Sequence, residues 1–260
     1  MTTNNLPQAL PLHAVHRLHA YRKSIATRPY AARGMKVRRC DRCLLPLQVC
    51  TCPSCRRLAS ATAFALVMYD TEVLKPSNSG RLIADLIPDT HAFLWSRTNP
   101  DPQLLALLAN PDYQPFLVFP GDYALPSQQV IEVLPDMPPL ARQYATGKKP
   151  LFILLDGCWR EAVKMFRKSP YLQSLPMLSF HPDTLARYQL RKGQREFQLG
   201  TAEVAALVLD AWGERENAQA LQLWFQVFVQ ASLWSRSARA PECLMRMQTL
   251  LAEFNQMTAS

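Results

Sequence analysis

The chain has 260 residues, of which 48% are hydrophobic and 19% are charged, a composition that predicts a packed core rather than disorder. Its apolar runs fall well short of the roughly 20 residues that a membrane-spanning helix needs. A compact apolar segment typical of a secretory signal is also missing from the N-terminal residues. We therefore expect a cytoplasmic protein that is not embedded in a membrane, and nothing in the sequence implies an obligate protein partner.

The net charge of +9 is distributed unevenly along the chain. Residues 1–69 contain eleven Lys or Arg and one acid, Asp41, whereas the remainder contains eighteen Lys or Arg and nineteen acids. A basic arm on a nearly neutral domain is typical of polyanion binding. An organelle transit peptide and a solubilising tail are the alternatives. We favour nucleic acid, because the basic run continues directly into a cysteine cluster.

A short helix is predicted over residues 12–21, in the basic arm, by apolar residues at helical spacing. His13, His16 and His19 share one face of this helix. Three histidines at this spacing could bind a metal. Such residues are more often solvated or face phosphate, and we adopt that interpretation.

Five of the seven cysteines fall within sixteen residues, with the spacing C-x2-C-x6-C-x-C-x2-C. Two thiolate pairs on tight turns can complete a tetrahedron around Zn²⁺. A redox pair and an iron–sulfur cluster are the alternatives. We predict a structural zinc site with Cys55 left spare, because four thiolates leave no open position for chemistry; the predicted ligands are Cys40, Cys43, Cys50 and Cys52.

From residue 63 onward, short apolar runs alternate with helical patterns. Buried strands are predicted at 64–69, 91–94, 116–119 and 151–155, and helices at 80–87, 104–109, 202–212, 218–234 and 243–254. Such alternation favours an α/β fold with a mostly parallel sheet flanked by helices. We expect a small N-terminal module over residues 1–60 and an α/β domain over 61–260.

Polar segments follow two of these strands, where ligands bind in an open α/β sheet. One runs over residues 72–81, and the other begins at Asp156, directly after the run 151–155. A third polar turn, at residues 200–203, opens a helix. Helix capping accounts for each turn locally, yet three such turns in one domain favour a ligand site.

The ordered set of motifs resembles the DTW-domain family, whose members include a bacterial tRNA-uridine aminocarboxypropyltransferase. The resemblance spans roughly residues 38–212 and rests on Cys40-x2-Cys43-x2-Pro46-x3-Cys50-x-Cys52, Glu72-x2-Lys75-x2-Asn78-x-Gly80-Arg81-Leu82, Asp156-Gly-Cys-Trp159 and Thr201-x-Glu203. In one position the chain departs from the family: the D-x-T-W motif reads D-G-C-W, with Cys158 in place of threonine.

The resemblance implies a SPOUT-like domain with a C-terminal knot that holds S-adenosylmethionine. It also implies transfer of the aminocarboxypropyl group to N3 of a uridine in the tRNA variable loop. On this basis we expect Asp156 to act as base or to orient N3, and Trp159 to stack nearby. The residues expected to contact the cofactor are Ser79, Arg81, Pro120, Gly157, Cys158, Thr201 and Glu203.

Three other functions fit parts of the sequence. A SPOUT-like RNA methyltransferase would release S-adenosylhomocysteine instead of methylthioadenosine. A zinc-ribbon protein without catalysis would bind tRNA regardless of S-adenosylmethionine. A ribosome-assembly factor would co-sediment with ribosomal particles. We rank all three below the aminocarboxypropyltransferase.

Overall fold

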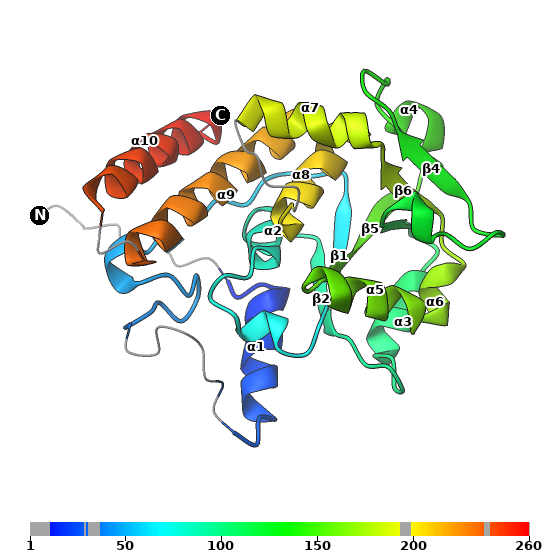
Figure 1. Cartoon of the computed structure of the whole chain (residues 1–260), viewed down its shortest axis with the longest axis horizontal. Helices are drawn as coiled ribbons and strands as arrows, with labels where there is room; N and C mark the ends of the chain where they lie inside the picture. The colour runs from blue at the N-terminus through cyan, green and yellow to red at the C-terminus, as the bar shows by residue number, and fades with distance from the viewer. Residues whose placement is uncertain (1–10, 29, 31–36, 193–198, 237–239, 260) are drawn as a thin grey trace, which may run out of the picture.

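The computed structural model describes residues 11–28, 30, 37–192, 199–236 and 240–259. Its strands form one sheet in the order β2-β1-β5-β3-β6-β4, and every neighbouring pair is parallel (Figure 1). The strands are β1 (Ala63–Met68), β2 (Thr90–Leu94), β3 (Tyr113–Val118), β4 (Val130–Val133), β5 (Lys149–Asp156) and β6 (Met177–Phe180).

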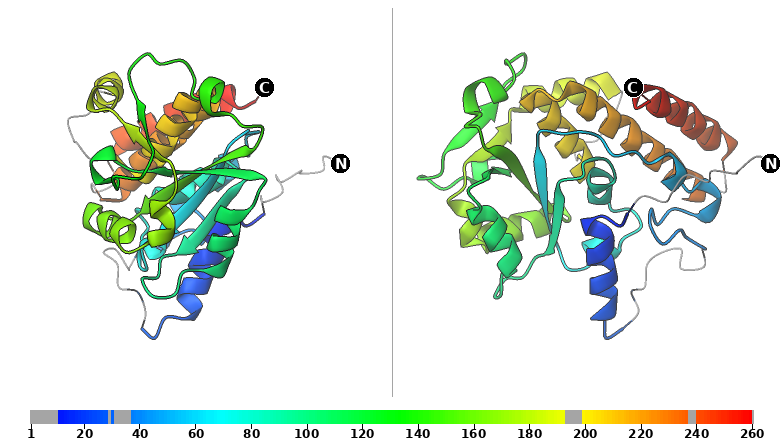
Figure 2. Two further views of the ribbon diagram at one scale, coloured as in Figure 1. Left: turned by 90° about the vertical axis from the view of Figure 1, so that its right-hand side faces the viewer. Right: turned by 180° about the vertical axis from the view of Figure 1, so that it is seen from behind.

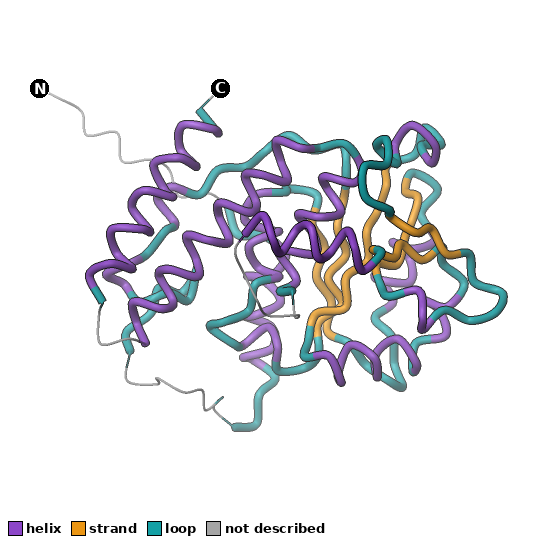
Figure 3. Tube along the Cα trace, turned by 45° about the horizontal axis from the view of Figure 1, so that its top comes forward, coloured by secondary structure: helices purple, strands orange, loops and turns teal. Residues whose placement is uncertain are grey.

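Helices cover both faces of the sheet, as the turned views and the trace show (Figures 2 and 3). One face packs against α2 (Gly80–Leu86), α8 (Thr201–Trp212) and α9 (Arg215–Arg236), with α10 (Pro241–Met257) lying along α9. The other face packs against α3 (Pro102–Ala109), α5 (Trp159–Arg167) and α6 (Pro170–Gln173). The remaining helices are α1 (Ala14–Ser24), α4 (Ala141–Tyr144) and α7 (Pro182–Lys192).

The central strands are buried on both faces because their side chains alternate between two core clusters. Phe64, Leu66 and Met68 of β1 face the cluster beneath α2, α8 and α9. Ala65 and Val67 of the same strand face the opposite cluster. This two-sided burial explains why β1 and β5 appear in the sequence as continuous apolar runs.

The predicted α/β fold with a mostly parallel sheet is confirmed. The four predicted strands correspond to β1, β2, β3 and β5, each displaced by no more than a few residues. β4 and β6 have only four residues each, and β4 alternates buried and exposed positions, so neither forms an apolar run. The C-terminal knot stays a prediction, as does the division into modules at residue 60.

The cysteine-rich segment and α1 pack directly onto the α/β layers. Val15 of α1 and Leu45 and Val49 of the cysteine segment belong to the same core cluster as Phe64 and Phe152 of the sheet. In Figure 1 this segment lies beside the carboxy-terminal part of α9, and α1 lies beside β2. The N-terminal elements therefore stabilise the domain through shared apolar burial.

Candidate active site

Asp156 is the last residue of β5, a central strand of the sheet. It is level with Met68 of β1, and its backbone oxygen accepts a hydrogen bond of 2.8 Å from Tyr69 N. The residue is only 3% exposed. The carboxyl ends of two adjacent parallel strands therefore place this carboxylate at the edge where α/β proteins bind ligands.

Both carboxylate oxygens of Asp156 accept hydrogen bonds from other loops. Asn78 Nδ2 donates to Oδ2 at 2.7 Å, and Thr201 Oγ1 donates to Oδ1 at 2.6 Å. Asn78 belongs to the loop after β1, and Thr201 is the first residue of α8. The buried carboxylate of Asp156 thus connects its own turn to the turns that contain Asn78 and Thr201, although the three are far apart in the sequence.

Asn78 connects this carboxylate to the start of α2. Its Oδ1 accepts from Arg81 N at 3.1 Å, and its backbone oxygen accepts from an Arg81 guanidinium nitrogen at 3.1 Å. Its Nδ2 also contacts Glu72 Oε1 at 3.3 Å, and Glu72 forms an ion pair with Lys75. The loop over residues 72–81 is therefore held by an internal polar network.

The turns approach so closely that small residues are required. A Cβ atom on Gly80 would lie 2.4 Å from Asp156 Oδ2, and one on Gly200 would lie 3.1 Å from Ser79 Oγ. Ser79 Oγ also accepts a weak hydrogen bond from Ala202 N at 3.4 Å. The two glycines therefore let α2 and α8 begin against the same strand end.

Burial, reinforced by the nearby charge of Glu72, raises the pKa of Asp156 to about 6. The hydrogen bonds from Thr201 and Asn78 act in the opposite direction, because they favour the ionised carboxylate. A carboxyl group with this pKa changes protonation state close to neutral pH, which is a common property of functional sites.

Trp159 is exposed beside this edge, at the start of α5. It is 48% exposed, its ring stacks on Phe119 at a centroid distance of 5.7 Å, and Tyr123 meets it edge-on at 5.7 Å. A second stacked pair, Tyr69 and Trp95, follows β1 and β2. The carboxyl edge of the sheet therefore presents aromatic surfaces from four strand ends.

Basic side chains accompany these aromatic rings. Lys164 Nζ lies 5.5 Å from the ring centroid of Tyr69 and 5.6 Å from that of Trp95. The Arg167 guanidinium lies 5.9 Å from the ring centroid of Tyr123. The exposed basic residues of this surface are Arg160, Lys164, Arg167 and Lys168. Positive charge next to stacked aromatic rings is a combination that suits nucleic acid.

The structure brings most of the expected cofactor residues together, although their burial differs. Ser79, Gly157 and Thr201 lie around Asp156, and Cys158 and Pro120 are exposed beside Trp159 and Phe119. Arg81 and Glu203 are buried, at 3% and 4% exposure. Glu203 Oε2 accepts from Gly200 N at 2.9 Å, as in a capping box, while the Arg81 contact to Asn78 fixes the loop. Their roles toward a cofactor stay predictions.

Sequence reasoning considered Asn78 as a helix cap and as part of a loop that helps to hold the cofactor or the RNA, but it did not predict the hydrogen bond from Asn78 to Asp156. It also gave no role to Phe119 and Tyr123, which support Trp159. The available signal for Phe119 and Tyr123 was their position soon after the end of β3.

The sulfur atoms of Cys40, Cys43, Cys50 and Cys52 all lie within 4.8 Å of one another. The Sγ–Sγ distance is 3.7 Å between Cys40 and Cys52 and 3.8 Å between Cys43 and Cys50. Zinc–sulfur bonds of about 2.3 Å in a tetrahedron place sulfurs about 3.8 Å apart, so this cluster can hold Zn²⁺. A closed set of four thiolates suits a structural metal.

Cys55 lies outside this group, as expected. Its Sγ contacts the backbone oxygen of Asp85 at 3.4 Å. Burial, reinforced by the charge of Asp85, raises the pKa of Cys55 to about 12. Cys55 is therefore a protonated thiol at neutral pH and a poor metal ligand.

Comparisons with known proteins place these features in a family. The search of solved structures finds no match. Among the described residues, no helix has the length and apolarity needed to cross a membrane. The family model of the DTW domain matches residues 37–233, a range that includes the cysteine cluster, both polar strand ends and the start of α8. Because this match covers more than half of the chain, the chain belongs to the DTW-domain family, a family consistent with tRNA modification.

Proposed function

We propose that this chain is a cytoplasmic tRNA-modifying enzyme that transfers the 3-amino-3-carboxypropyl group of S-adenosylmethionine to N3 of a uridine. In this reaction the bond between sulfur and the γ-carbon breaks, and its electron pair stays on sulfur. A new bond forms between N3 and the γ-carbon, while the N3 proton leaves to a base. Methylthioadenosine departs as a neutral thioether, so the leaving group needs no protonation.

The observation that carries this proposal is the convergence of three polar turns on Asp156 at the carboxyl edge of a parallel sheet. Two helices, α2 and α8, begin at this point. Their first turns are held by side chains of the loop after β1, because Asn78 Oδ1 accepts from Arg81 N and Ser79 Oγ accepts from Ala202 N. Membership of the DTW-domain family supports tRNA modification, and the polar contacts around Asp156 give a rigid frame that can orient a donor.

The contacts of Asp156 favour a positioning role over direct proton abstraction. A general base must reach the proton that it removes, whereas this carboxylate is 3% exposed and accepts a hydrogen bond on each oxygen. We therefore assign to Asp156 the task of fixing the loops that hold the donor.

Trp159 and the basic face of α5 are proposed to receive the RNA. Single-stranded bases are recognised largely by stacking on aromatic rings, and phosphates by Lys and Arg. An exposed indole supported by Phe119 provides such a surface next to the donor site. The zinc module and the basic N-terminal arm would add phosphate contacts at a distance from the reaction.

The test incubates the purified chain with unmodified tRNA and S-adenosylmethionine. Chromatography of the small products and mass spectrometry of the tRNA nucleosides should reveal methylthioadenosine and an aminocarboxypropyl uridine in equal amounts. S-adenosylhomocysteine together with a methylated nucleoside would establish the methyltransferase alternative instead. Tight tRNA binding without either product would support a non-catalytic RNA-binding protein.

A matched pair of variants connects the reaction to the site. Asp156→Ala should reduce the modification rate by at least tenfold while tRNA binding is retained, because it removes both oxygens that hold the Asn78 and Thr201 loops. The control is Asp89→Asn, which removes a carboxylate paired with Lys149 at the opposite end of the sheet. Equal rates for both variants and the wild type would exclude Asp156 from the mechanism.

A further inference from the structure

A second aromatic group, formed by Tyr69 and Trp95, lies at the carboxyl edge of the sheet beside Asp156. Tyr69 directly follows β1 and Trp95 directly follows β2. Their rings stack at a centroid distance of 5.7 Å and an interplanar angle of 18°. Backbone hydrogen bonds of 2.8 Å run from Trp95 N to Met68 O and from Tyr69 N to Asp156 O. The position of this stack is therefore fixed relative to the end of β5.

Both rings of this stack are held by their surroundings, yet each is only half-buried. Trp95 Nε1 donates a hydrogen bond of 2.9 Å to Oγ of the buried Ser169. A Cβ atom on Gly157 would lie 3.2 Å from Tyr69 Cβ, so Tyr69 packs against the turn that follows Asp156. Because its N–H group is already engaged, the indole of Trp95 can stack on a base but cannot read the identity of that base by hydrogen bonding.

Lys164 adds a positive charge to the stack. Its Nζ lies 5.5 Å from the ring centroid of Tyr69, 5.6 Å from that of Trp95 and 3.3 Å from Tyr69 Oη. The side chain is exposed and forms no ion pair with a carboxylate in the part of the chain that the structure describes. Arg167, which follows three residues later on α5, lies beside Tyr123 in the same way. Each aromatic group therefore has its own cation, which can bind a phosphate while the rings stack on a base.

The two aromatic groups flank the end of β5. Strands β1 and β2, which lead to Tyr69 and Trp95, lie on one side of β5. Strand β3, which leads to Phe119 and its stacked partner Trp159, lies on the other side. The ends of β2 and β3 are three interstrand spacings apart, or roughly 14 Å, whereas neighbouring bases of a stacked strand are only about 3.4 Å apart. Bases that occupy both groups therefore belong to an unpaired strand whose stacking is interrupted.

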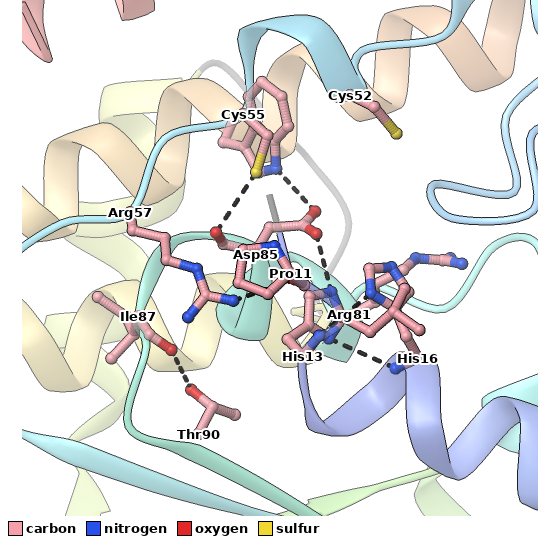
Figure 4. A network of polar contacts seen from close by, with 12 residues as sticks. Pro11, His13, His16, Cys52, Cys55, Arg57, Arg81, Asp85, Ile87 and Thr90 are labelled. Carbon is pink, nitrogen blue, oxygen red and sulfur yellow. Dashed lines mark hydrogen bonds and ion pairs between the residues drawn. The ribbon is translucent and has the colours of Figure 1, made fainter. Parts of the chain in front are cut away.

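The polar side chains where α1 meets α2, by contrast, are engaged with one another (Figure 4). His13 Nδ1 accepts from His16 N, so its Nε2 carries the proton and donates to Asp85 Oδ1 at 3.0 Å. Trp224 Nε1 donates to Asp85 Oδ2 at 3.0 Å. His13 is therefore a buried partner of Asp85 rather than a phosphate-facing residue, and this junction fastens α1 to the domain instead of offering groups to a ligand.

We propose that Tyr69, Trp95 and Lys164 form a second base-binding subsite, which holds an unpaired nucleotide of the same RNA strand as the reacting uridine. This inference rests on the proposed RNA substrate and adds a requirement to it, because the RNA must offer two unpaired bases, one to each aromatic group. The subsite should accept any base, since every base has a face that can stack and the N–H group of Trp95 is engaged elsewhere.

The first measurement is the binding of unmodified tRNA to the full chain, followed by fluorescence anisotropy without S-adenosylmethionine. Trp95→Ala should weaken binding by about tenfold, because it removes a ring on which a base stacks. Trp95→Phe keeps a ring and should bind within about threefold of the wild type. Lys164→Ala should weaken binding and reduce its dependence on salt. The control Lys148→Ala removes an exposed charge just before β5, at the opposite edge of the sheet, and should bind like the wild type.

The second measurement identifies the base that stacks at this subsite. Transfer RNAs with a single abasic nucleotide at each unpaired position are bound to the wild type and to Trp95→Ala. One position other than the reacting uridine should lose about tenfold in affinity for the wild type and nothing further for Trp95→Ala, because both changes remove the same contact. Replacing the base at this position by any other base should leave the affinity nearly unchanged.

Two outcomes would overturn the subsite. One is additivity of the abasic change and Trp95→Ala at every position, and the other is binding by folded Trp95→Ala and Lys164→Ala that equals that of the wild type. Lys164→Ala alters an exposed side chain, so it decides the question if Trp95→Ala does not fold. Since binding is measured without the donor, failure to form an aminocarboxypropyl uridine would refute the proposed reaction and leave the outcome for the subsite standing.

Discussion

Two buried aspartates at opposite ends of one short helix show how partners decide the state of a carboxyl group. Asp156 abuts Gly80, the first residue of α2, and Asp85 lies in the last turn of the same helix. They are 3% and 9% exposed. Burial raises the pKa of Asp156 to about 6. Burial also acts on Asp85, but His13, Trp224 and Arg81 outweigh it and hold the pKa of that carboxyl below its ordinary value.

The difference follows from the charge of the neighbours. Asp156 accepts from a neutral amide and a neutral hydroxyl, and Glu72 repels its charge. Asp85 faces an imidazole, an indole N–H and a guanidinium. Asp85 therefore resembles a structural ion-pair partner, whereas Asp156 is poised to change protonation state. Only the second is typical of a functional site.

The largest expected effect is on Asp85. Asp85→Ala should lower the free energy of unfolding by about 3–5 kcal/mol, because it leaves buried donors and a buried guanidinium without their carboxylate. Denaturation by urea measures this change. The control Asp70→Ala removes an exposed ion pair with Arg22 and should cost no more than about 1 kcal/mol. Equal losses for the two variants would contradict the structural role of Asp85.

Asp156→Asn should have the opposite effect on stability at neutral pH. Since the folded pKa exceeds the ordinary value of 3.8, wild-type stability falls as the pH rises from 3.8 to about 6. Asparagine cannot ionise and can still bond to Asn78 and Thr201. The stability of the variant relative to the wild type should therefore increase as the pH rises through this window, by roughly 3 kcal/mol at most.

Urea denaturation of both proteins at pH 4 and pH 8 measures this relative gain. A stability difference that is the same at both values would show that Asp156 titrates as an ordinary carboxyl group. Loss of modification activity in a variant that is at least as stable as the wild type would separate function from folding at this residue.

Gly80→Ala tests how tightly α2 is held against Asp156. The added Cβ would lie 2.4 Å from Asp156 Oδ2, so the carboxylate or the helix must shift. Such overpacking costs about 1–3 kcal/mol. The melting temperature and the modification rate should both fall. The control is Ser77→Ala, a change at an exposed position of the same loop. Equal melting temperatures and modification rates for the two variants would show that the space between Gly80 and Asp156 can accommodate a Cβ atom.

The smallest effect is expected at Cys158, the N-cap of α5. Its backbone N–H already donates to Glu161 Oε2 at 2.7 Å. Cys158→Thr restores the family motif and adds a hydroxyl that can cap the helix, which should stabilise the chain by up to about 1 kcal/mol. Thermal melting checks this, with Cys158→Ala as a variant that lacks a capping oxygen. A large gain in activity would instead show that this hydroxyl contacts a substrate.

The sequence predicted the class of fold because the buried strands of a parallel sheet are short apolar runs. It also identified the four cysteines that the structure brings together and left Cys55 outside. Spacing sufficed there, because the ligands of each pair are neighbours in the chain. The short strands β4 and β6 were not predicted, because four residues are too few to show a clear periodicity of apolar residues.

Local sequence also placed Asp156 at a strand end and the glycine-bearing turns at helix starts. Only the tertiary structure showed that Asn78 and Thr201 share that carboxylate, and that His13 reaches Asp85. These pairs are separated by 45 to 78 residues. Their proximity, and with it the opposite pKa shifts of the two aspartates, depends on strand order and helix packing, which short-range patterns do not encode.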